Sequence, residues 1–305
     1  MTLHYTAEPR DQGKTLFSVL HYRLRISTGQ IKRLKYQTVM LVNGQPVHTN
    51  YRVEPGDAIE LPLPEEHASF PPEPGDLTVL YEDEAIIALH KPAGIIMHPS
   101  ATRDTGTLAN QLLYYLGGGT VHAINRLDRD TTGVTVFAKN SYVKSVLTET
   151  LRVAGIHKTY LAPVYGRLPQ PEGVIDLPID RVSPDSLWRT IRDCGQPART
   201  GYHLLEEQGL WALYAFHPLT GRTHQIRLHC LASGAPILGD PVYCTEESSL
   251  FSDALDLPHQ LLTCVEMTFP HPMTGETRSI TTAPEWAETL GCATDFTRGA
   301  GAWNC

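Results

Sequence analysis

The sequence predicts an α+β protein, in which a mixed, largely antiparallel sheet with flanking helices follows a small α/β unit. Runs with the apolar pattern of strands outnumber those with the pattern of helices, and short turns join many of them. The segment 67–76, HASFPPEPGD, holds three prolines and one glycine, a composition that continues neither a helix nor a central strand. We therefore expect a small domain over residues 1–66, a linker over 67–76, a large domain over 77–290 and a loosely attached tail over 291–305.

The small domain is expected to begin with two helices. Apolar residues at helical spacing predict a helix over 15–24, and a second short helix is expected over 27–35, with Ser27 or Thr28 as its cap. The Asn-Gly turn at 43–44 lies between two extended runs, which is typical of a β-hairpin. A Pro-Gly turn at 55–56 then leads into a strand over 58–61.

The large domain begins with two extended runs around an acidic turn, within 77–91. Further strands are predicted over 133–139, 159–165, 202–205, 211–217 and 262–269. Helices are predicted over 107–116, 140–153 and 222–232, and the second of these is amphipathic, with Asn140 as its cap.

The composition excludes several classes of protein. With 41% hydrophobic and 19% charged residues among 305, the chain is not disordered, collagen-like or a coiled coil. It has no apolar run near the roughly 20 residues that span a bilayer, and no secretory signal at its start. The six cysteines are spaced too widely for a C-x-x-C zinc site. We expect a cytoplasmic, monomeric protein with reduced thiols and no membrane partner.

The charge pattern leaves two interpretations of the small domain open. The whole chain has a formal net charge of −8, which by itself argues against a nucleic-acid partner. The segment 23–35, however, contains five basic residues and no acid. Such a run is either a solvated helix face or a surface that contacts RNA. The pattern of 15–24, 26–35 and VMLVNGQPVHTNYRVEPGDAIEL resembles the S4 domain, a small RNA-binding module, and this resemblance favours RNA contact by Lys32, Arg33 and Lys35.

The segment 125–133, NRLDRDTTG, is the most informative for chemistry. It places Asp128 between Arg126 and Arg129 on a loop directly before a predicted strand. A carboxylate is a nucleophile only while it is ionised, and a neighbouring guanidinium favours that form. Taken alone, Arg-Leu-Asp is a common tripeptide, and by itself it favours structural salt bridges over catalysis.

Three further stretches carry residues of interest. In LTGRTHQIRLH, Arg227 can pair with a buried carboxylate, whereas His224 and His229 are five residues apart, a poor spacing for two metal ligands on one helix. In HKTYLAPVYG, Tyr160 is either a core residue or a platform for a base. In LHKPAGIIMH, Lys91 lies beside a rigid turn.

Taken together and in this order, these stretches resemble the RluA family of pseudouridine synthases. The resemblance covers nearly all of 77–277 and includes LYEDEAIIALHKPAGIIMHPS, HAINRLDRDTTGVTVFAKN, HKTYLAPVYG, GQPARTGYHLL, HPLTGRTHQIRLHCLASGAPILGDPVY and FPHPMTGE. Two positions depart from the family pattern, because Asn125 stands where the family has His and Thr132 where it has Ser. Both lie outside the acid and its arginine, so we expect them to tune the loop and to preserve activity.

The resemblance implies a role for each matching residue. Asp128 falls on the catalytic aspartate, Tyr160 on the tyrosine that stacks on the target base, and Arg227 on the arginine that pairs with the aspartate. Arg126 falls on the arginine that fills the gap left by the flipped nucleotide. Lys91 and Arg222 lie in family blocks and are expected to contact the substrate. The fold implied is the pseudouridine synthase fold, and because the reaction neither adds nor removes atoms, no cofactor or metal is expected.

The expected function is isomerisation of uridine to pseudouridine in structured RNA, first ribosomal RNA of the large subunit and second transfer RNA. The target base must be flipped out of its stack, which costs a few kcal/mol. Two other functions compete with this one. The protein could be an S4-type RNA-binding protein without turnover, or a retaining glycoside or nucleoside hydrolase that uses a carboxylate pair.

Overall fold

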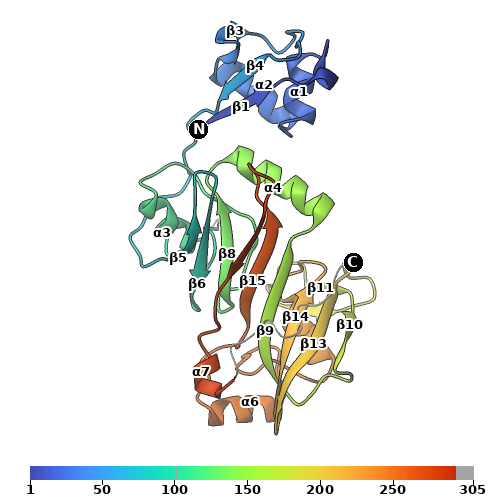
Figure 1. Ribbon diagram of the computed structural model, residues 1–305. Helices are drawn as coiled ribbons and strands as arrows, with labels where there is room; N and C mark the ends of the chain where they lie inside the picture. The colour runs from blue at the N-terminus through green and yellow to red at the C-terminus, as the bar shows by residue number, and fades with distance from the viewer. Residues whose placement is uncertain (101, 293–305) are drawn as a thin grey trace.

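A computed structural model describes residues 1–100 and 102–292, and it contains a small sheet and a large one (Figure 1). The small sheet has four strands in the order β1-β4-β2-β3 and is accompanied by two helices. The helices predicted over 15–24 and 27–35 and the hairpin around 43–44 are confirmed, whereas the first strand was not predicted. The bounds are β1 Thr2–Thr6, 3-10 helix η1 Pro9–Asp11, α1 Leu16–Tyr22, α2 Thr28–Gln37, β2 Met40–Val42, β3 Gln45–Val47 and β4 Ala58–Pro62.

The large sheet has ten strands, and eight of them follow the order β10-β13-β14-β9-β15-β8-β6-β5, with β16 paired to β15 and β7 to β8. Every pairing in it is antiparallel except that of β15 with β8, so the predicted mixed, largely antiparallel sheet is confirmed. The strands are β5 Thr78–Glu82, β6 Ile86–Lys91, β7 His122–Ala123, β8 Thr132–Ala138, β9 His157–Tyr165, β10 Glu172–Asp176, β13 Arg199–Gln208, β14 Trp211–Pro218, β15 Thr263–Pro270 and β16 Thr277–Thr281.

Helices and a separate hairpin surround this sheet. The hairpin of β11 and β12 pairs only with itself. The bounds are α3 Leu108–Tyr115, α4 Ser141–Ala154, β11 Ile179–Arg181, β12 Arg189–Ile191, α5 Gln225–Ala232, α6 Glu246–Ala254 and α7 Ala287–Leu290. None of the helices within the described residues is long and apolar enough to cross a membrane. Of the tail expected over 291–305, residues 293–305 lie outside the described part of the chain.

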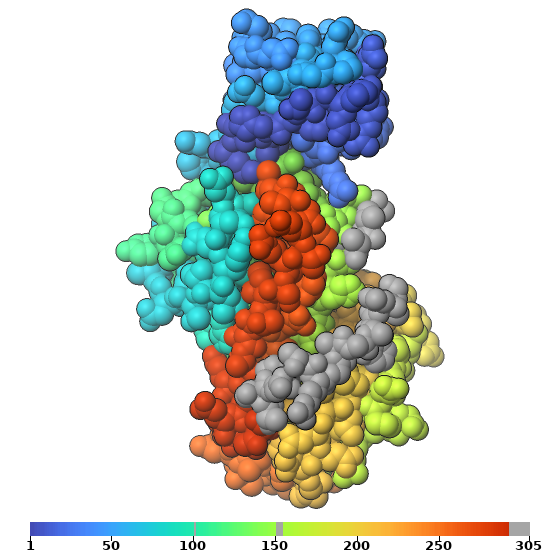
Figure 2. Space-filling model, in the orientation of Figure 1, coloured from blue at the N-terminus to red at the C-terminus, as the bar shows by residue number. Residues whose placement is uncertain are grey.

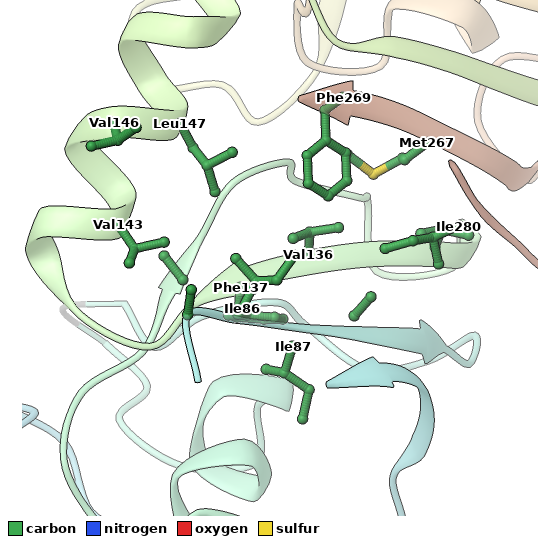
Figure 3. Packing of buried hydrophobic residues seen from close by; sticks show 14 of the residues in the cluster. Ile86, Ile87, Val136, Phe137, Val143, Val146, Leu147, Met267, Phe269 and Ile280 are labelled. Atoms are coloured by element: carbon green, nitrogen blue, oxygen red, sulfur yellow. The ribbon is translucent and has the colours of Figure 1, made fainter. Parts of the chain in front are cut away.

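The amphipathic helix α4 packs on one face of the sheet, over β8 and β15 (Figure 3). Asn140 caps it, because its side-chain oxygen accepts a hydrogen bond from the Val143 amide at 2.9 Å. Val143 and Leu147 are completely buried, and in Figure 3 they point toward the side chains of β8 and β15. The apolar spacing of the helix therefore fixes its orientation on the sheet.

A glycine allows β8 and β15 to approach each other closely. Gly133 has a φ of +104°, and a Cβ atom at this position would lie 2.2 Å from the carbonyl oxygen of Cys264. Cys264 pairs in turn with Tyr160 on β9. The late strand β15 thus lies between two strands that come far earlier in the chain, and it brings the loop before β8 close to β9.

One helix begins later than the sequence predicts. A helix is expected over 222–232, but α5 begins at Gln225, because His224 has a left-handed backbone with a φ of 58°. Gln225 stabilises the preceding turn, since its side-chain oxygen accepts hydrogen bonds from the Thr220 hydroxyl and the Arg222 amide. Arg222 therefore lies on a loop and not on the helix.

The small unit lies against the end of the large sheet where β8 leads into α4 (Figures 1 and 2). The Gln30 side chain of α2 donates a hydrogen bond to the carbonyl oxygen of Ser141, at 3.1 Å. Glu66, which follows β4, accepts a hydrogen bond from the Ser141 amide at 3.0 Å and lies 3.6 Å from His122. The first turn of α4 is thus the junction between the two units.

Candidate active site

A buried lysine holds the backbone of the loop that carries Asp128. Lys91, at the end of β6, is completely buried and donates hydrogen bonds to the carbonyl oxygens of Arg129 at 2.6 Å and of Pro92 at 2.7 Å. Burial lowers the pKa of Lys91 to about 8, although Asp130 and Asp128 act in the opposite direction. The sequence places Lys91 in contact with the substrate, but the structure differs: its ammonium group is turned into the protein and holds the backbone of the loop.

The two residues that depart from the family pattern stabilise the base of the same loop. The Asn125 side chain accepts a hydrogen bond from the Val136 amide at 2.9 Å and donates one to the carbonyl oxygen of Val134 at 3.0 Å. The Thr132 hydroxyl lies 2.7 Å from that of Thr263 on β15, and both are buried. Both residues therefore make buried hydrogen bonds at the base of the loop, and neither contacts the Asp128 carboxylate in these bonds.

Arg227 joins two carboxylates. Its Nε and Nη2 atoms donate to the two oxygens of Asp240 at 2.7 and 2.8 Å, and its Nη1 atom donates to Asp128 Oδ2 at 3.3 Å. The Asp240 side chain is completely buried and that of Arg227 is 7% exposed, whereas the Asp128 side chain is 26% exposed. The bidentate pair with Asp240 fixes the plane of the guanidinium, so that Nη1 presents an N–H to the carboxylate that reaches the surface.

Tyr160 lies on β9 beside Asp128, with 7% of its surface exposed. Burial raises the pKa of its hydroxyl well above the usual value, and the neighbouring Cys264 and Asp128 raise it further. The phenol therefore remains protonated in neutral solution. Lys158, two residues earlier on the same strand, is half-buried, and burial lowers its pKa.

The side chains of Asp128, Arg227, Tyr160 and Lys158 line one pocket, together with two exposed arginines. Arg126 precedes Asp128 on the loop, and Arg222 lies on the turn before α5, where its Nε atom donates to the carbonyl oxygen of Pro197 at 3.1 Å. The pocket is lined by Arg126, Leu127, Asp128, Thr131, Lys158, Tyr160, Pro218, Thr220, Gly221, Arg222, His224, Gln225, Ile226, Arg227 and Leu262. Five of the predicted site residues thus lie around one opening, and the aspartate and its arginine touch.

The three basic residues predicted on the small unit are far from this pocket. Lys32, Arg33 and Lys35 are exposed on α2, which contacts the start of α4 at the far end of β8 from the Asp128 loop. Seven residues of β8 separate the two places, a span of about 20 Å at the usual rise of a strand. At this distance these side chains cannot contact a molecule bound in the pocket.

Sequence reasoning missed the residues that support the site. Asp240 and Tyr243 both lie in the segment 239–243, GDPVY. No local pattern in this segment indicates that either side chain supports the site. Tyr243 lies beneath the Arg227 guanidinium, 5.1 Å from its carbon to the ring centre, and its hydroxyl lies 2.9 Å from His224 Nδ1. The described residues include no group of three or more His, Cys, Asp or Glu side chains that could hold a metal ion.

The fold and part of the sequence match known RNA pseudouridylate synthases. The fold is that of the pseudouridylate synthases: human RNA pseudouridylate synthase domain containing 1 superposes with a TM-score of 0.57 at 24% identity, over 69% of this chain and 85% of that one. Residues 85–232 match the family model described as RNA pseudouridylate synthase.

Relatives that are similar over most of the chain identify the family. The RNA pseudouridine synthase YlyB of Bacillus subtilis is 34% identical over 82% of this chain and 83% of its own length. The ribosomal large subunit pseudouridine synthase D of Xanthomonas campestris is 34% identical over 77% of this chain and 75% of its own length. The chain belongs to the RluA family of RNA pseudouridine synthases, and the resemblance seen in its six ordered blocks is confirmed.

Proposed function

We propose that this enzyme isomerises specific uridines in structured RNA of the large ribosomal subunit. The substrate class is supported by its relatives, since those of Xanthomonas campestris and Nitrosomonas europaea, 34% and 37% identical, are named ribosomal large subunit pseudouridine synthase D. The observation that carries the site assignment is the contact between Asp128 and Arg227 in a pocket that also contains Tyr160.

Asp128 is the residue that acts on the reacting nucleotide in this proposal. Arg227 stabilises the carboxylate charge through a hydrogen bond, and Asp240 holds the arginine in place. The bond between N1 and C1′ breaks, the detached uracil turns within the pocket, and C5 forms the new bond to C1′. Asp128 lies at the mouth of the pocket, where the sugar of a flipped nucleotide would enter.

Two side chains would hold the base out of its stack. Tyr160 offers an uncharged aromatic ring within the pocket, and stacking of a base on an aromatic ring contributes about 1–3 kcal/mol. Arg126 is exposed at the rim, where it can occupy the gap that the base leaves in the RNA helix. These contacts offset the unstacking cost of a few kcal/mol.

The small unit would bind RNA at a distance from the reaction. We assign residues 1–66 as an S4-like domain whose helix α2 contacts phosphates through Lys32, Arg33 and Lys35. The separation of about 20 Å along β8 means that one RNA must cover both places, which favours a folded substrate over a short strand.

The test compares Asp128→Asn with the wild-type enzyme on ribosomal RNA transcripts labelled with tritium at C5. Asn keeps the shape and removes the charge, so we expect the rate of tritium release to fall by about a thousandfold or more. Asp130→Asn is the matched control, because this neighbouring carboxylate bonds to the Gly94 amide and Arg129 and does not line the pocket. It should lose less than about tenfold.

A map of pseudouridine in cells with and without the gene tests the substrate. We expect the missing positions to fall in large-subunit ribosomal RNA. Positions that disappear only from transfer RNA would contradict the proposed substrate and leave the activity standing. An Asp128→Asn enzyme as active as the wild type would contradict the site.

A further inference from the structure

His224 lies in the wall of the active-site pocket with a backbone conformation that residues other than glycine rarely adopt. Its φ and ψ are 58° and 20°, in the left-handed region, and it immediately precedes α5. Such a conformation costs of the order of 1–3 kcal/mol and, in residues other than glycine, is concentrated at functional sites. The turn brings the imidazole Nε2 atom to 4.0 Å from Asp128 Oδ2.

A chain of hydrogen bonds fixes which imidazole nitrogen carries the proton. The backbone amide of Arg189 donates to the Tyr243 hydroxyl at 3.0 Å, and that hydroxyl lies 2.9 Å from His224 Nδ1. Tyr243 is 4% exposed, and of its two hydrogen-bond partners within the described residues the Arg189 amide can only donate, which leaves His224 Nδ1 as the acceptor. The hydroxyl therefore donates to Nδ1, and the proton of the neutral ring is on Nε2.

The surroundings keep this ring neutral. Burial lowers the pKa of His224, and Arg227 and Arg189 lower it further, against the opposing effect of Asp128 and Asp240. Asp128 lies 4.0 Å from the ring and the Tyr243 hydroxyl lies 2.9 Å from it, whereas Arg227, Arg189 and Asp240 act on it through their charges. The site thus presents one oriented N–H donor, on Nε2, beside the catalytic carboxylate.

The reaction creates negative charge at this place. When the bond between N1 and C1′ breaks, its electron pair remains on the uracil and spreads over N1, O2 and O4. C1′ is then satisfied either by an oxygen of Asp128 or by loss of the proton on C2′. Later C5 supplies the pair for its bond to C1′, while the bond from C1′ to Asp128 breaks and returns its pair to the carboxylate, or, on the other route, C2′ regains its proton. C5 then loses its proton, and N1 gains one. O2 is the carbonyl oxygen next to N1, so it lies nearest to C1′ and to Asp128 at the moment of cleavage.

We propose that His224 is a further catalytic residue, whose Nε2–H donates a hydrogen bond to O2 of the flipped uracil and stabilises the uracil anion as the glycosidic bond breaks. A preformed donor aimed at developing charge is worth about a hundredfold to a thousandfold in rate. This inference rests on the proposed role of Asp128, since that role places C1′ beside Nε2.

The experiment replaces one atom of the substrate and one side chain of the enzyme. The substrate is an RNA stem-loop that carries the mapped target uridine, made with uridine, 2-thiouridine or 4-thiouridine at that position. The variant is His224→Asn, because Asn tolerates the left-handed backbone and its shorter side chain does not reach the base. Sulfur accepts hydrogen bonds weakly. In the proposal, 2-thiouridine therefore removes the oxygen that accepts the hydrogen bond from Nε2, whereas 4-thiouridine keeps it.

With uridine we expect His224→Asn to slow single-turnover conversion about a hundredfold, with little change in RNA affinity. With 2-thiouridine the wild type and the variant should differ by only a few-fold, whereas with 4-thiouridine the hundredfold difference should remain. A difference that is equal on all three substrates, that collapses only on 4-thiouridine, or that is below about threefold on uridine would overturn the proposal.

Tyr243→Phe tests the hydrogen-bond chain separately. Phe keeps the ring beneath Arg227 and removes the hydroxyl that fixes the proton on Nε2, so we expect a loss of about tenfold that also disappears on 2-thiouridine. Wild-type rates in this variant would contradict the assigned tautomer. The outcomes differ from those for the proposed function: an active Asp128→Asn enzyme removes the whole site, whereas an active His224→Asn enzyme with an inactive Asp128→Asn removes only this inference.

Discussion

Arg227 and the basic side chains of α2 carry the same charge in opposite surroundings. The Arg227 side chain is 7% exposed and is bonded to two carboxylates. Lys32, Arg33 and Lys35 are exposed, and within the described residues none of them has a carboxylate partner. The contrast indicates a division of labour. In the proposed function the buried charge, held in one geometry, supports the chemistry, whereas the exposed charges, held in none, attract phosphates non-specifically.

The two surroundings respond differently to mutation. Removing one partner of a buried ion pair leaves an uncompensated charge in the protein interior, which costs about 3–5 kcal/mol. Exposed ion pairs contribute about 0–1 kcal/mol and are screened by salt. Stability should therefore depend on the buried cluster, and the salt dependence of RNA binding on the exposed one.

The largest effect is expected for Asp240→Asn. The substitution removes the negative charge and one of the two acceptor oxygens that face the buried Arg227, and leaves Asp128 at 3.3 Å as its carboxylate partner, so the free energy of unfolding should fall by about 3–5 kcal/mol. Denaturant unfolding measures this loss. The control is Asp176→Asn, because Asp176 also pairs with an arginine, Arg199 at 3.3 Å, but both side chains are more than half exposed. It should lose less than about 1 kcal/mol, and equal losses in the two variants would contradict the comparison.

The second largest effect is expected for Arg126, which is exposed like the basic residues of α2 but lines the pocket like Arg227. Arg126 is exposed but lies at the rim of the pocket. If it fills the gap left by the flipped base, Arg126→Ala should lower activity on folded RNA about tenfold more than on a short flexible strand, since only folded RNA requires full unstacking. Rates on the two substrates measure this. Arg129→Ala is the control, because Arg129 pairs with Asp130 and lies outside the pocket lining. Equal losses on both substrates in Arg126→Ala would remove the assigned role.

The sequence predicts local features better than long-range ones. The helices of the small unit, the hairpin at 43–44 and the amphipathic α4 follow from caps, turns and apolar spacing, which act within a few residues. Strand β15 lies between β8 and β9, a pairing that joins residues more than a hundred positions apart. No local pattern specifies such a pairing, although Gly133 is required by it.

The same division applies to the site. Asp128, Tyr160 and Arg227 were predicted because each lies in an ordered block of the family pattern. Lys91 was also predicted, but with the wrong contact, because the direction of a side chain depends on the strand that carries it and on the loop it meets. Of the five basic residues in 23–35, Arg23 pairs with the buried Asp11 at 2.8 Å, a partner outside the run that the charge count did not consider. Tertiary partners decide which charges are free.

The smallest effect is expected when the free charges of α2 are removed together. In the triple variant Lys32→Gln, Arg33→Gln and Lys35→Gln, each lost phosphate contact should lower the slope of log affinity against log salt concentration by about 0.7–0.9. RNA binding at several salt concentrations gives this slope. The thermal midpoint should be unchanged, because these side chains bond to no carboxylate within the described residues. Turnover on a short strand should also be unchanged, because α2 is about 20 Å from the pocket along β8. A slope equal to that of the wild type would show that this face of α2 is only a solvated surface, whereas a loss of turnover on the short strand would show that α2 acts on the pocket itself.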